Sequence, residues 1–447
     1  MIPNKIAFVY DRVQLGHAPV LNYNLKSVDS DDRSHANYGP STGRFRNSTH
    51  HYKEKVCQNR DSKDLTFKTA KDQDRFVIYD IGLVEGPQVW LEDPYDKTNR
   101  KNKKNIFDLI NDNNPKLYPL LRKKRGIILL DQSMEAFPLY SQKTSYPHSY
   151  QQDYYKIIHD KLSYYKISPS SIHYTTSNLY EHKIYNEWCS DNNITDKIVI
   201  HSYNYFAKIS QHAGFFQENS EDLASITVDE HLQFKTANNI KTFSNLNRVI
   251  RTHRIALLYM LNYYNLLDNS HTSFSNFDQM HKVLYSKHAA WKKDNIENTR
   301  KKLPLILDVT DFNINQAQNF FKETYLNTWY SVITETFFQD YFKYSMFFSE
   351  KIFKPIRARH PFVLVAQPYA IEQLKQLGFR TFHEFWDEGY DEIRDPTDRL
   401  EHICKLIKKL NSYTKDEWLD LYKRMQPILE HNYNHLMQTK WDKDINV

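Results

Sequence analysis

Apolar runs of strand length alternate with segments of helical spacing along most of the chain. In the first half, such runs occupy residues 75–81, 126–131, 172–176 and 197–203. Apolar residues at helical spacing separate them over 106–121, 149–165 and 181–192. Because strands and helices that alternate with short connections are typical of a parallel, doubly wound sheet, this half predicts a Rossmann-like domain.

The same alternation begins again after residue 240. Gly378 follows an expected helix, at the position where a glycine commonly ends one. Residues 395–440 are amphipathic and helical, and we expect them to pack back across the domains. The predicted fold class is therefore α/β, with two Rossmann-like domains. In this half the strands are expected at 241–246, 304–308, 329–336 and 362–366, and the helices at 251–267, 315–324, from Ser349 and at 370–377, with a partly helical stretch at 281–300.

Changes of composition mark the expected domain boundaries. Residues 1–74 are polar with few aliphatic side chains, and they predict an irregular N-terminal extension. The N-terminal domain then covers 75–210, and an acidic, irregular connection covers 211–240. The C-terminal domain covers 241–410, and C-terminal helices complete the chain at 411–447.

Charge and glycine content narrow the ways in which a ligand can be held. The chain has 447 residues and a net charge of +6, and 9 of its residues are glycine. Neither glycine-rich phosphate pattern, G-x-G-x-x-G or G-x-x-x-x-G-K-[ST], occurs in it. Bound phosphates would therefore need Lys and Arg side chains and helix N-termini. The mild positive charge suits an anionic ligand, but it is too small to diagnose nucleic acid binding.

Cysteine usage and hydropathy indicate the compartment. Cys57, Cys189 and Cys404 are far apart and form no C-x-x-C pair, so neither a disulfide framework nor a zinc site is expected. The N-terminus lacks an apolar stretch of signal-peptide length, and no apolar run is long enough to span a bilayer. We therefore expect a cytoplasmic protein.

Basic residues gather at the start of the helix over 251–267. Arg251 and Arg254 share a face of this helix, and Arg248 precedes them in the turn. Guanidinium groups at a helix N-terminus are suited to a pyrophosphate. The alternative is a solvated basic helix start in which one arginine pairs with an acid elsewhere.

Two more candidates for a binding site are Glu335 and the triplet Ser349-Glu350-Lys351. Glu335 lies at the end of an expected strand, and acids at the carboxyl ends of parallel strands face the ligand crevice. In the triplet, the carboxylate can take the two hydroxyls of a ribose while the ammonium meets a phosphate oxygen. The structural alternatives are that Glu335 caps the next helix and that Ser349 only caps the helix that it begins.

The residues from 347 to 391 carry a series of motifs that resembles a known family. The family is one of bacterial and phage proteins regarded as glycosyltransferases, and the series is also similar to the donor-binding half of the α1,3-fucosyltransferases. The resemblance covers residues 125–410, but this chain has His360-Pro361-Phe362-Val363 where the fucosyltransferases have Val-Pro-Val. The motifs are Ser349-Glu350-Lys351, Lys354-Pro355-Ile356, Pro361-Phe362, Leu377-Gly378-Phe379-x-Thr381-Phe382 and Asp387-Glu388-x-Tyr390-Asp391, preceded by Asn247-Arg248-x-x-Arg251-x-His253-Arg254.

This resemblance implies that the C-terminal domain binds a nucleotide-sugar. An arginine of the 248–254 segment would bind the donor diphosphate, Glu350 the ribose and Lys351 a phosphate. The implied arrangement is GT-B, in which two domains face across a cleft, and no cofactor is expected besides the donor substrate. No Asp-x-Asp motif lies between two expected strands, so we expect no metal site. We predict that the acids from Asp387 to Asp391 are structural.

The implied reaction is transfer of the sugar to an acceptor hydroxyl, with inversion. One carboxylate or imidazole must then take the hydroxyl proton. Glu135, in the loop after the strand at 126–131, is the first candidate, since the fucosyltransferases are thought to use a glutamate in a first-domain loop. Asp131, at the end of that strand, is the second. The alternative is that these acids cap a helix or bind nothing.

The acceptor is left open by the sequence. The resembling genes occur in phages, so a hydroxymethylated base in duplex DNA is an alternative to a glycan, and a phage-encoded chain would act in the host cytoplasm. A non-catalytic sugar- or nucleic-acid-binding protein on the same fold is an alternative from another class. The sugar, the nucleotide and the oligomeric state are not specified.

Overall fold

The computed structural model describes most of the chain between Phe76 and Trp441. It forms two compact units. The first takes its described residues from Met1–Lys208, Tyr341–Phe347 and Lys440–Val447, and the second from Ile209–Asp340 and Phe348–Thr439. The described residues are 76–81, 107, 111, 115–132, 136, 138–142, 152–211, 217–218, 222–223, 225–247, 249–276, 289–306, 320–339 and 345–441.

The first unit is built on a sheet of four described strands. Their order is β1-β2-β5-β6, and every neighbouring pair is parallel. This order confirms the parallel α/β arrangement that the sequence predicts. The strands are β1 (Phe76–Ile81), β2 (Gly126–Gln132), β5 (Ile172–Thr176) and β6 (Val199–Ser202). Around them lie α5 (Leu117–Arg122), the strand pair β3 (Tyr140–Ser141) and β4 (Gln152–Asp153), α6 (Tyr154–Tyr165) and α7 (Glu181–Asp191), while α8 (Tyr205–Ser210) leads into the second unit.

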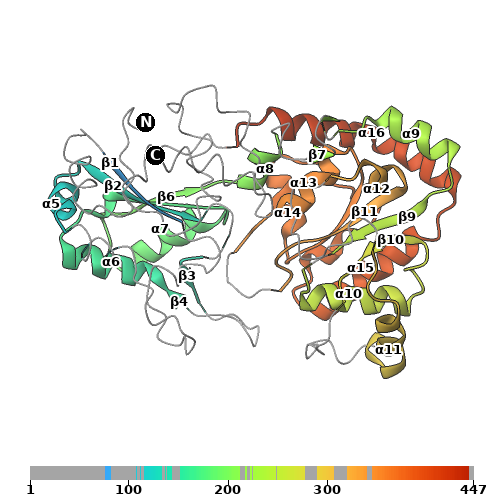
Figure 1. The fold of residues 1–447 in the computed structure, drawn as a ribbon, viewed down its shortest axis with the longest axis horizontal. Coiled ribbons are helices and arrows are strands. Elements are labelled where there is room, and N and C mark those ends of the chain that lie inside the picture. Colours follow the sequence, from blue (N-terminus) through green and yellow to red (C-terminus); the bar gives the residue numbers. More distant parts are fainter. Residues whose placement is uncertain are drawn as a thin grey trace. The chain divides into compact units, whose positions relative to one another are not determined.

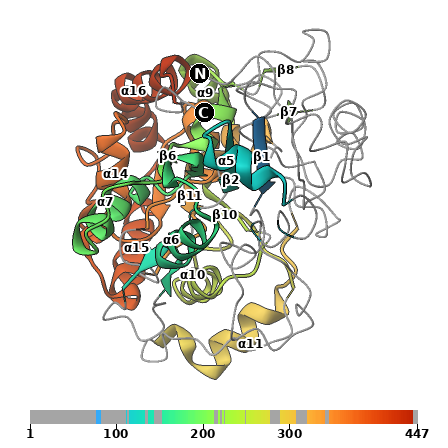
Figure 2. The ribbon, with the colours of Figure 1, turned by 90° about the vertical axis from the view of Figure 1, so that its left-hand side faces the viewer.

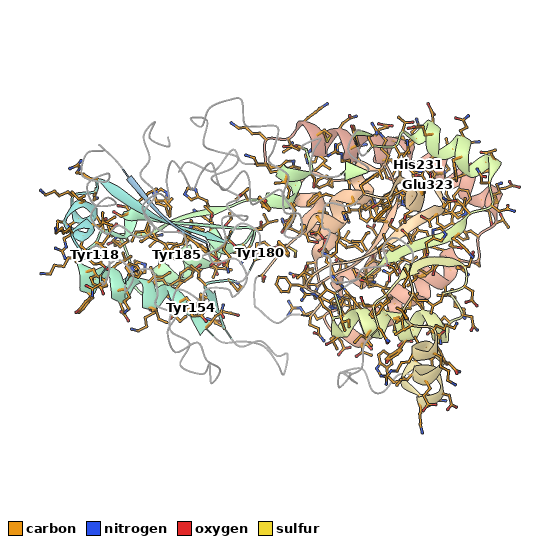
Figure 3. All side chains as sticks on the ribbon, viewed as in Figure 1. Tyr118, Tyr154, Tyr180, Tyr185, His231 and Glu323 are labelled. Atoms are coloured by element: carbon orange, nitrogen blue, oxygen red, sulfur yellow. The ribbon has the colours of Figure 1, made fainter. Side chains whose placement is uncertain are left out.

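Aromatic side chains fill the core between α6 and α7 of the first unit. The ring centroid of Tyr155 lies 4.7 Å from that of Tyr185 and 5.3 Å from that of Trp188. All three side chains are buried, and Tyr185 can be located on its helix in Figure 3. Ile128 and Ile172 contribute the aliphatic part of the same core from β2 and β5. The large aromatic content of the chain therefore serves packing here.

The second unit also contains a parallel sheet. Its order is β10-β9-β11-β12. The strands are β9 (Lys241–Leu246), β10 (Ser270–Ser273), β11 (Thr328–Thr334) and β12 (Phe362–Val365). The helices are α9 (Val228–Ala237), α10 (Thr252–Tyr263), α11 (Lys293–Lys301), α12 (Lys322–Leu326), α13 (Glu350–Arg357), α14 (Ala370–Gln376), α15 (Pro396–Leu410) and α16 (Lys415–Gln438), and a short antiparallel pair, β7 (Gln217–Glu218) with β8 (Asp222–Leu223), precedes them.

Helices cover both faces of the second sheet. α16 packs against α9 and α13, while α10 packs against α11 and α15. Figures 1 and 2 show these two groups on opposite sides of the strands. Trp418 of α16 stacks on Trp329 of β11 with 5.9 Å between ring centroids, which fixes the long helix to the sheet of its own unit. The unit is thus the three-layer sandwich expected of a doubly wound sheet.

The edge strand of the second sheet is a correction to the sequence prediction. The sequence predicts a strand at 304–308, of which 307 and 308 lie outside the described residues, and Leu305 forms an isolated bridge with Phe274. The edge position is taken by β10, whose sequence Ser-His-Thr-Ser has no aliphatic residue. An edge strand needs fewer apolar side chains than a central one, so its polar pattern resembles that of a loop.

The connection expected at 211–240 is also different from the prediction. Residues 228–237 form α9, although the stretch was interpreted as irregular. Thr227 and Glu230 form a capping box at its start, with the Thr227 hydroxyl accepting from the Glu230 amide and the Glu230 carboxylate accepting from the Thr227 amide. His231 and Lys235 are buried on the face of α9 that most helices fill with apolar side chains. The apolar spacing that predicts a helix is therefore weak in this stretch. His231 is labelled in Figure 3.

Candidate functional site

The strand order of the second unit singles out one edge of its sheet. The chain passes from β9 to β10 on one side of β9, and β11 and β12 then lie on the other side. Open parallel sheets bind ligands beyond the carboxyl ends of the strands where the order reverses in this way. Here that point lies between β9 and β11. Among the described strands of the first unit, β1-β2-β5-β6 follow one another without a reversal.

Arg254 occupies this point from the first turn of α10. Only 2% of its surface is exposed. Its Nη1 donates to the carbonyl of Val249 at 2.9 Å, and its Nη2 donates to the carbonyl of Thr334 at 3.2 Å. The guanidinium therefore joins the loop after β9 to the end of β11. Its Nε is buried and has no hydrogen-bond partner in the described part of the chain.

Glu335 and Ser349 meet at the same edge. Glu335 directly follows β11 and is fully buried. The Ser349 hydroxyl donates to Glu335 Oε2 at 2.6 Å, and the Ser349 amide lies 3.3 Å from both carboxylate oxygens. Ser349 is also the N-cap of α13, because its hydroxyl accepts from the amide of Lys351. Ser349 therefore caps α13, as the structural alternative predicts, and it also bonds the carboxylate of Glu335; its role in donor binding stays a prediction.

Lys351 completes this cluster with Glu350. Its ammonium lies 2.9 Å from Glu350 Oε1 and donates to the Ser349 hydroxyl at 3.1 Å. The side chain of Lys351 is 27% exposed and that of Glu350 is 12% exposed. An ammonium has three donors, and these two contacts use two of them. One N–H of Lys351 therefore has no partner among the described residues.

Positive charge persists at the site despite burial. Burial, with repulsion from Arg251, lowers the pKa of Arg254 to about 10, while Glu335 and Glu350 act in the opposite direction. Arg254 consequently stays protonated near neutral pH. No carboxylate among the described residues lies within ion-pair distance of it, so this buried cation is held by backbone carbonyls and not by an ion pair.

The two carboxylates of the cluster differ in their tendency to ionise. Burial raises the pKa of Glu335, although Lys351 opposes this. Burial also acts to raise the pKa of Glu350, but attraction to Lys351 and Lys354 outweighs it, and the pKa falls. Of the two, Glu350 is therefore the acid that ionises more readily.

The other predicted site residues fall into two groups. Arg251 is exposed and lies at the N-cap of α10, where no side chain caps the helix. Arg248 and Glu135 lie outside the described residues, and of Asp131 only the backbone is described, as the sixth residue of β2. The roles assigned to these residues therefore stay predictions.

Asn247 and His253 belong to the site but were not among its predicted residues. The Thr334 hydroxyl donates to Asn247 Oδ1, and the imidazole Nε2 of His253 lies 3.0 Å from the carbonyl of Glu335. Both side chains are buried. Asn247 ties the end of β9, and His253 the start of α10, to the end of β11. The sequence could have identified both residues, because they belong to the same motif, 247–254, as Arg254.

Neither a membrane span nor a metal-binding group occurs in the part of the chain that the structure describes. No described helix is long and apolar enough to cross a bilayer. Three or more His, Cys, Asp or Glu side chains arranged to hold a metal ion are likewise not found among the described residues.

Comparison with known proteins gives a distant structural likeness. No protein-family profile matches the chain, and no curated protein matches it either. Among solved structures, an α,α-trehalose 6-phosphate synthase from Burkholderia multivorans is similar at 12% sequence identity and a TM-score of 0.36. The match covers 86% of this chain and 74% of that one.

Proposed function

We propose that the second unit binds the diphosphate of a nucleotide-sugar and that the protein is a glycosyltransferase. The observation that carries the proposal is the buried cation Arg254, which lies where the strand order of the sheet reverses. Among the described residues, no carboxylate lies within ion-pair distance of it. Buried charges are normally paired or hydrogen-bonded to charged groups. A bound diphosphate would supply the missing anion.

The surroundings of Arg254 suit a diphosphate better than a single carboxylate. Arg251 at the start of α10 and Lys351 at the start of α13 bring further positive charge from two separate loops. Two phosphate groups can engage both loops at once, and charge-assisted contacts from guanidinium and ammonium groups are among the stronger hydrogen bonds. We assign the diphosphate to Arg254 and Lys351, and the ribose hydroxyls to the Glu350 carboxylate.

The proposed reaction is a single displacement at the anomeric carbon. The acceptor oxygen forms a bond to that carbon while the bond to the donor diphosphate breaks, and the hydroxyl proton passes to a base. Glu135 is the proposed base, with Asp131 as the second candidate. Arg254 and Lys351 would stabilise the negative charge that develops on the leaving diphosphate. Inversion at the anomeric carbon follows from a single displacement.

The test is release of nucleoside diphosphate from a panel of nucleotide-sugars, with glycan acceptors, with hydroxymethylated duplex DNA, and with no acceptor. We expect one nucleotide-sugar to be consumed, and the effective acceptor to accelerate its consumption. Consumption that is faster with DNA and inhibited by salt would identify the DNA acceptor. Binding of a nucleotide-sugar without turnover under any condition would contradict the enzyme and support a binding protein.

A further inference from the structure

Tyr369 is an exposed aromatic side chain at the same edge of the second sheet. It belongs to the loop after β12, and 40% of its surface is exposed. Its backbone is left-handed, with φ 65° and ψ 16°. This conformation is uncommon for residues other than glycine and is strained for a bulky one, so the surroundings must hold it.

The segment around Asp391 holds this loop in place. The Tyr369 amide donates to the carbonyl of Asp391 at 2.8 Å. The Asp391 carboxylate accepts from the amides of Ile371 and Glu372 at 3.0 Å each. The acids at this position are thus structural, as predicted, and their contacts reach the loop that carries Tyr369.

The ring of Tyr369 is supported as well as its backbone. The guanidinium carbon of Arg394 lies 5.8 Å from the ring centroid. A ring that is fixed before a ligand arrives loses little conformational entropy when it stacks on that ligand. The left-handed backbone of Tyr369 costs folding free energy. A role of the ring in ligand binding would explain why this cost is accepted.

Tyr369 lies within reach of the proposed diphosphate site. Val365 pairs with Thr334, and the amide of Glu335 donates to the carbonyl of Val365 at 3.0 Å. The backbones of β11 and β12 therefore end side by side at this edge. Tyr369 follows Val365 by four residues, which span at most about 14 Å of chain. A ribose lies between the base and the diphosphate of a nucleotide, so base and diphosphate must occupy neighbouring subsites of this kind.

Gln373 adds a polar group beside Tyr369. It lies four residues further along the chain, in α14, and its backbone N–H donates to the Tyr369 carbonyl at 3.0 Å. Gln373 is 7% exposed, and its Oε1 is buried without a partner among the described residues. Because this oxygen is covered by protein, a base that stacks on Tyr369 would reach it only if the Gln373 side chain moved.

We infer that Tyr369, backed by Arg394, is the surface on which the nucleobase of the donor stacks. The inference rests on the proposed function, because it assigns the base of the same nucleotide-sugar. Every nucleobase has a π-face, so Tyr369 supplies affinity for all of them. Discrimination between bases would come from hydrogen bonds to the edge of the base.

The test is calorimetric titration of the full chain with UDP, GDP and ADP, and separately with inorganic pyrophosphate. Loss of one base–aromatic stack should weaken binding of the preferred nucleoside diphosphate roughly five- to a hundredfold in Tyr369→Ala. Tyr369→Phe should bind as the unaltered chain does. Pyrophosphate affinity should be the same in all of these proteins, since it has no base.

Two control variants separate stacking from backbone effects. Tyr369→Asn adopts the left-handed conformation more easily but has no ring, so it should lose affinity as Tyr369→Ala does. Tyr164→Ala removes a tyrosine of the first unit that is 77% exposed, and it should change nothing.

The possible outcomes distinguish this inference from the proposed function. Full nucleotide affinity in Tyr369→Ala, or an equal loss of pyrophosphate affinity, would overturn the inference alone. Failure of the unaltered chain to bind any of the three nucleotides would contradict the proposed function, and the inference with it.

Discussion

The hydroxyl of Ser349 donates a hydrogen bond of 2.6 Å to the carboxylate of Glu335. This single contact fixes the start of α13 against the end of β11, fourteen residues earlier in the chain. It places the Glu350–Lys351 pair at the edge of the sheet where Arg254 is buried. The position of the proposed donor site therefore depends on the cap Ser349 and the acid Glu335. From the sequence alone, each of these residues also has a purely structural explanation.

Removal of this contact should destabilise the second unit. Ser349→Ala deletes an N-cap and leaves the buried Glu335 without its hydroxyl donor, so we expect a loss of about 2–4 kcal/mol in the free energy of unfolding. Thr414→Ala is the matched control, because Thr414 caps α16 with exposed partners, and it should cost about 0.5–2 kcal/mol. Denaturant titration measures both. Equal losses would show that the Glu335 contact contributes nothing.

Stability should also depend on pH through Glu181 of the first unit. Burial raises the pKa of this carboxyl from 4.5 to about 7, against hydrogen bonds from Tyr155, Leu139 and Asn178. The folded unit therefore binds this proton more tightly than the unfolded chain does. Its contribution is fully present below pH 4.5 and is lost as pH rises through about 7, by roughly 3 kcal/mol in total.

Two variants test this assignment by unfolding at a series of pH values. Glu181→Gln should remove this part of the decline, whatever its effect on stability at a single pH. Tyr155→Phe keeps the carboxyl but deletes a donor that lies 2.6 Å from it and favours its ionised form. That variant should decline further toward alkaline pH. An unchanged profile in Glu181→Gln would assign the pH dependence to other groups.

The proposed base gives a kinetic prediction. Glu135→Gln should slow sugar transfer by roughly a hundred- to ten-thousandfold, because a general base typically contributes that much. Nucleotide-sugar affinity should be kept, since the proposed donor contacts lie in the second unit. Glu187→Gln, which changes an exposed acid of α7, is the control. Normal transfer by Glu135→Gln would discard the assignment and make Asp131→Asn the next variant to measure.

Lys351 should contribute to donor binding without being essential for the fold. Its side chain is partly exposed, and Lys351→Ala removes one charge-assisted contact to the diphosphate. We expect nucleoside diphosphate binding to weaken by about 1.5–3 kcal/mol, roughly ten- to a hundredfold. Lys409→Ala, at an exposed position of α15, should bind normally. Calorimetric titration compares them, and unchanged binding in Lys351→Ala would remove this residue from the site.

Four of the described strands could be predicted closely, because each is a short run of strand-forming residues between turn residues. The expected boundaries of β5 and β9 agree with the structure, and β2 and β12 differ from the prediction by one residue at one end. β10 could not be found in the same way. Its stability comes from pairing along β9 and not from apolar side chains, and periodicity does not report pairing.

The candidate site was predictable as a set of residue types but not as an arrangement. Arg254, Glu335 and Ser349 were identified from motif and strand-end position. That Arg254 would be buried against two carbonyls, and that Ser349 would bond Glu335, depends on contacts between residues 80 and 14 positions apart. Such pairings are decided by the packing of α10 and α13 onto the sheet, which the local sequence does not specify.

The most direct test of the account is the affinity of Arg254 variants for nucleoside diphosphates. Calorimetry should show that the unaltered chain binds one of UDP, GDP or ADP and that Arg254→Gln, checked for folding by circular dichroism, binds it at least about tenfold more weakly. Arg380→Gln, at an exposed position of the same unit, should bind normally. Equal affinity in Arg254→Gln and the unaltered chain, or no binding by either, would contradict a diphosphate site at this edge of the sheet.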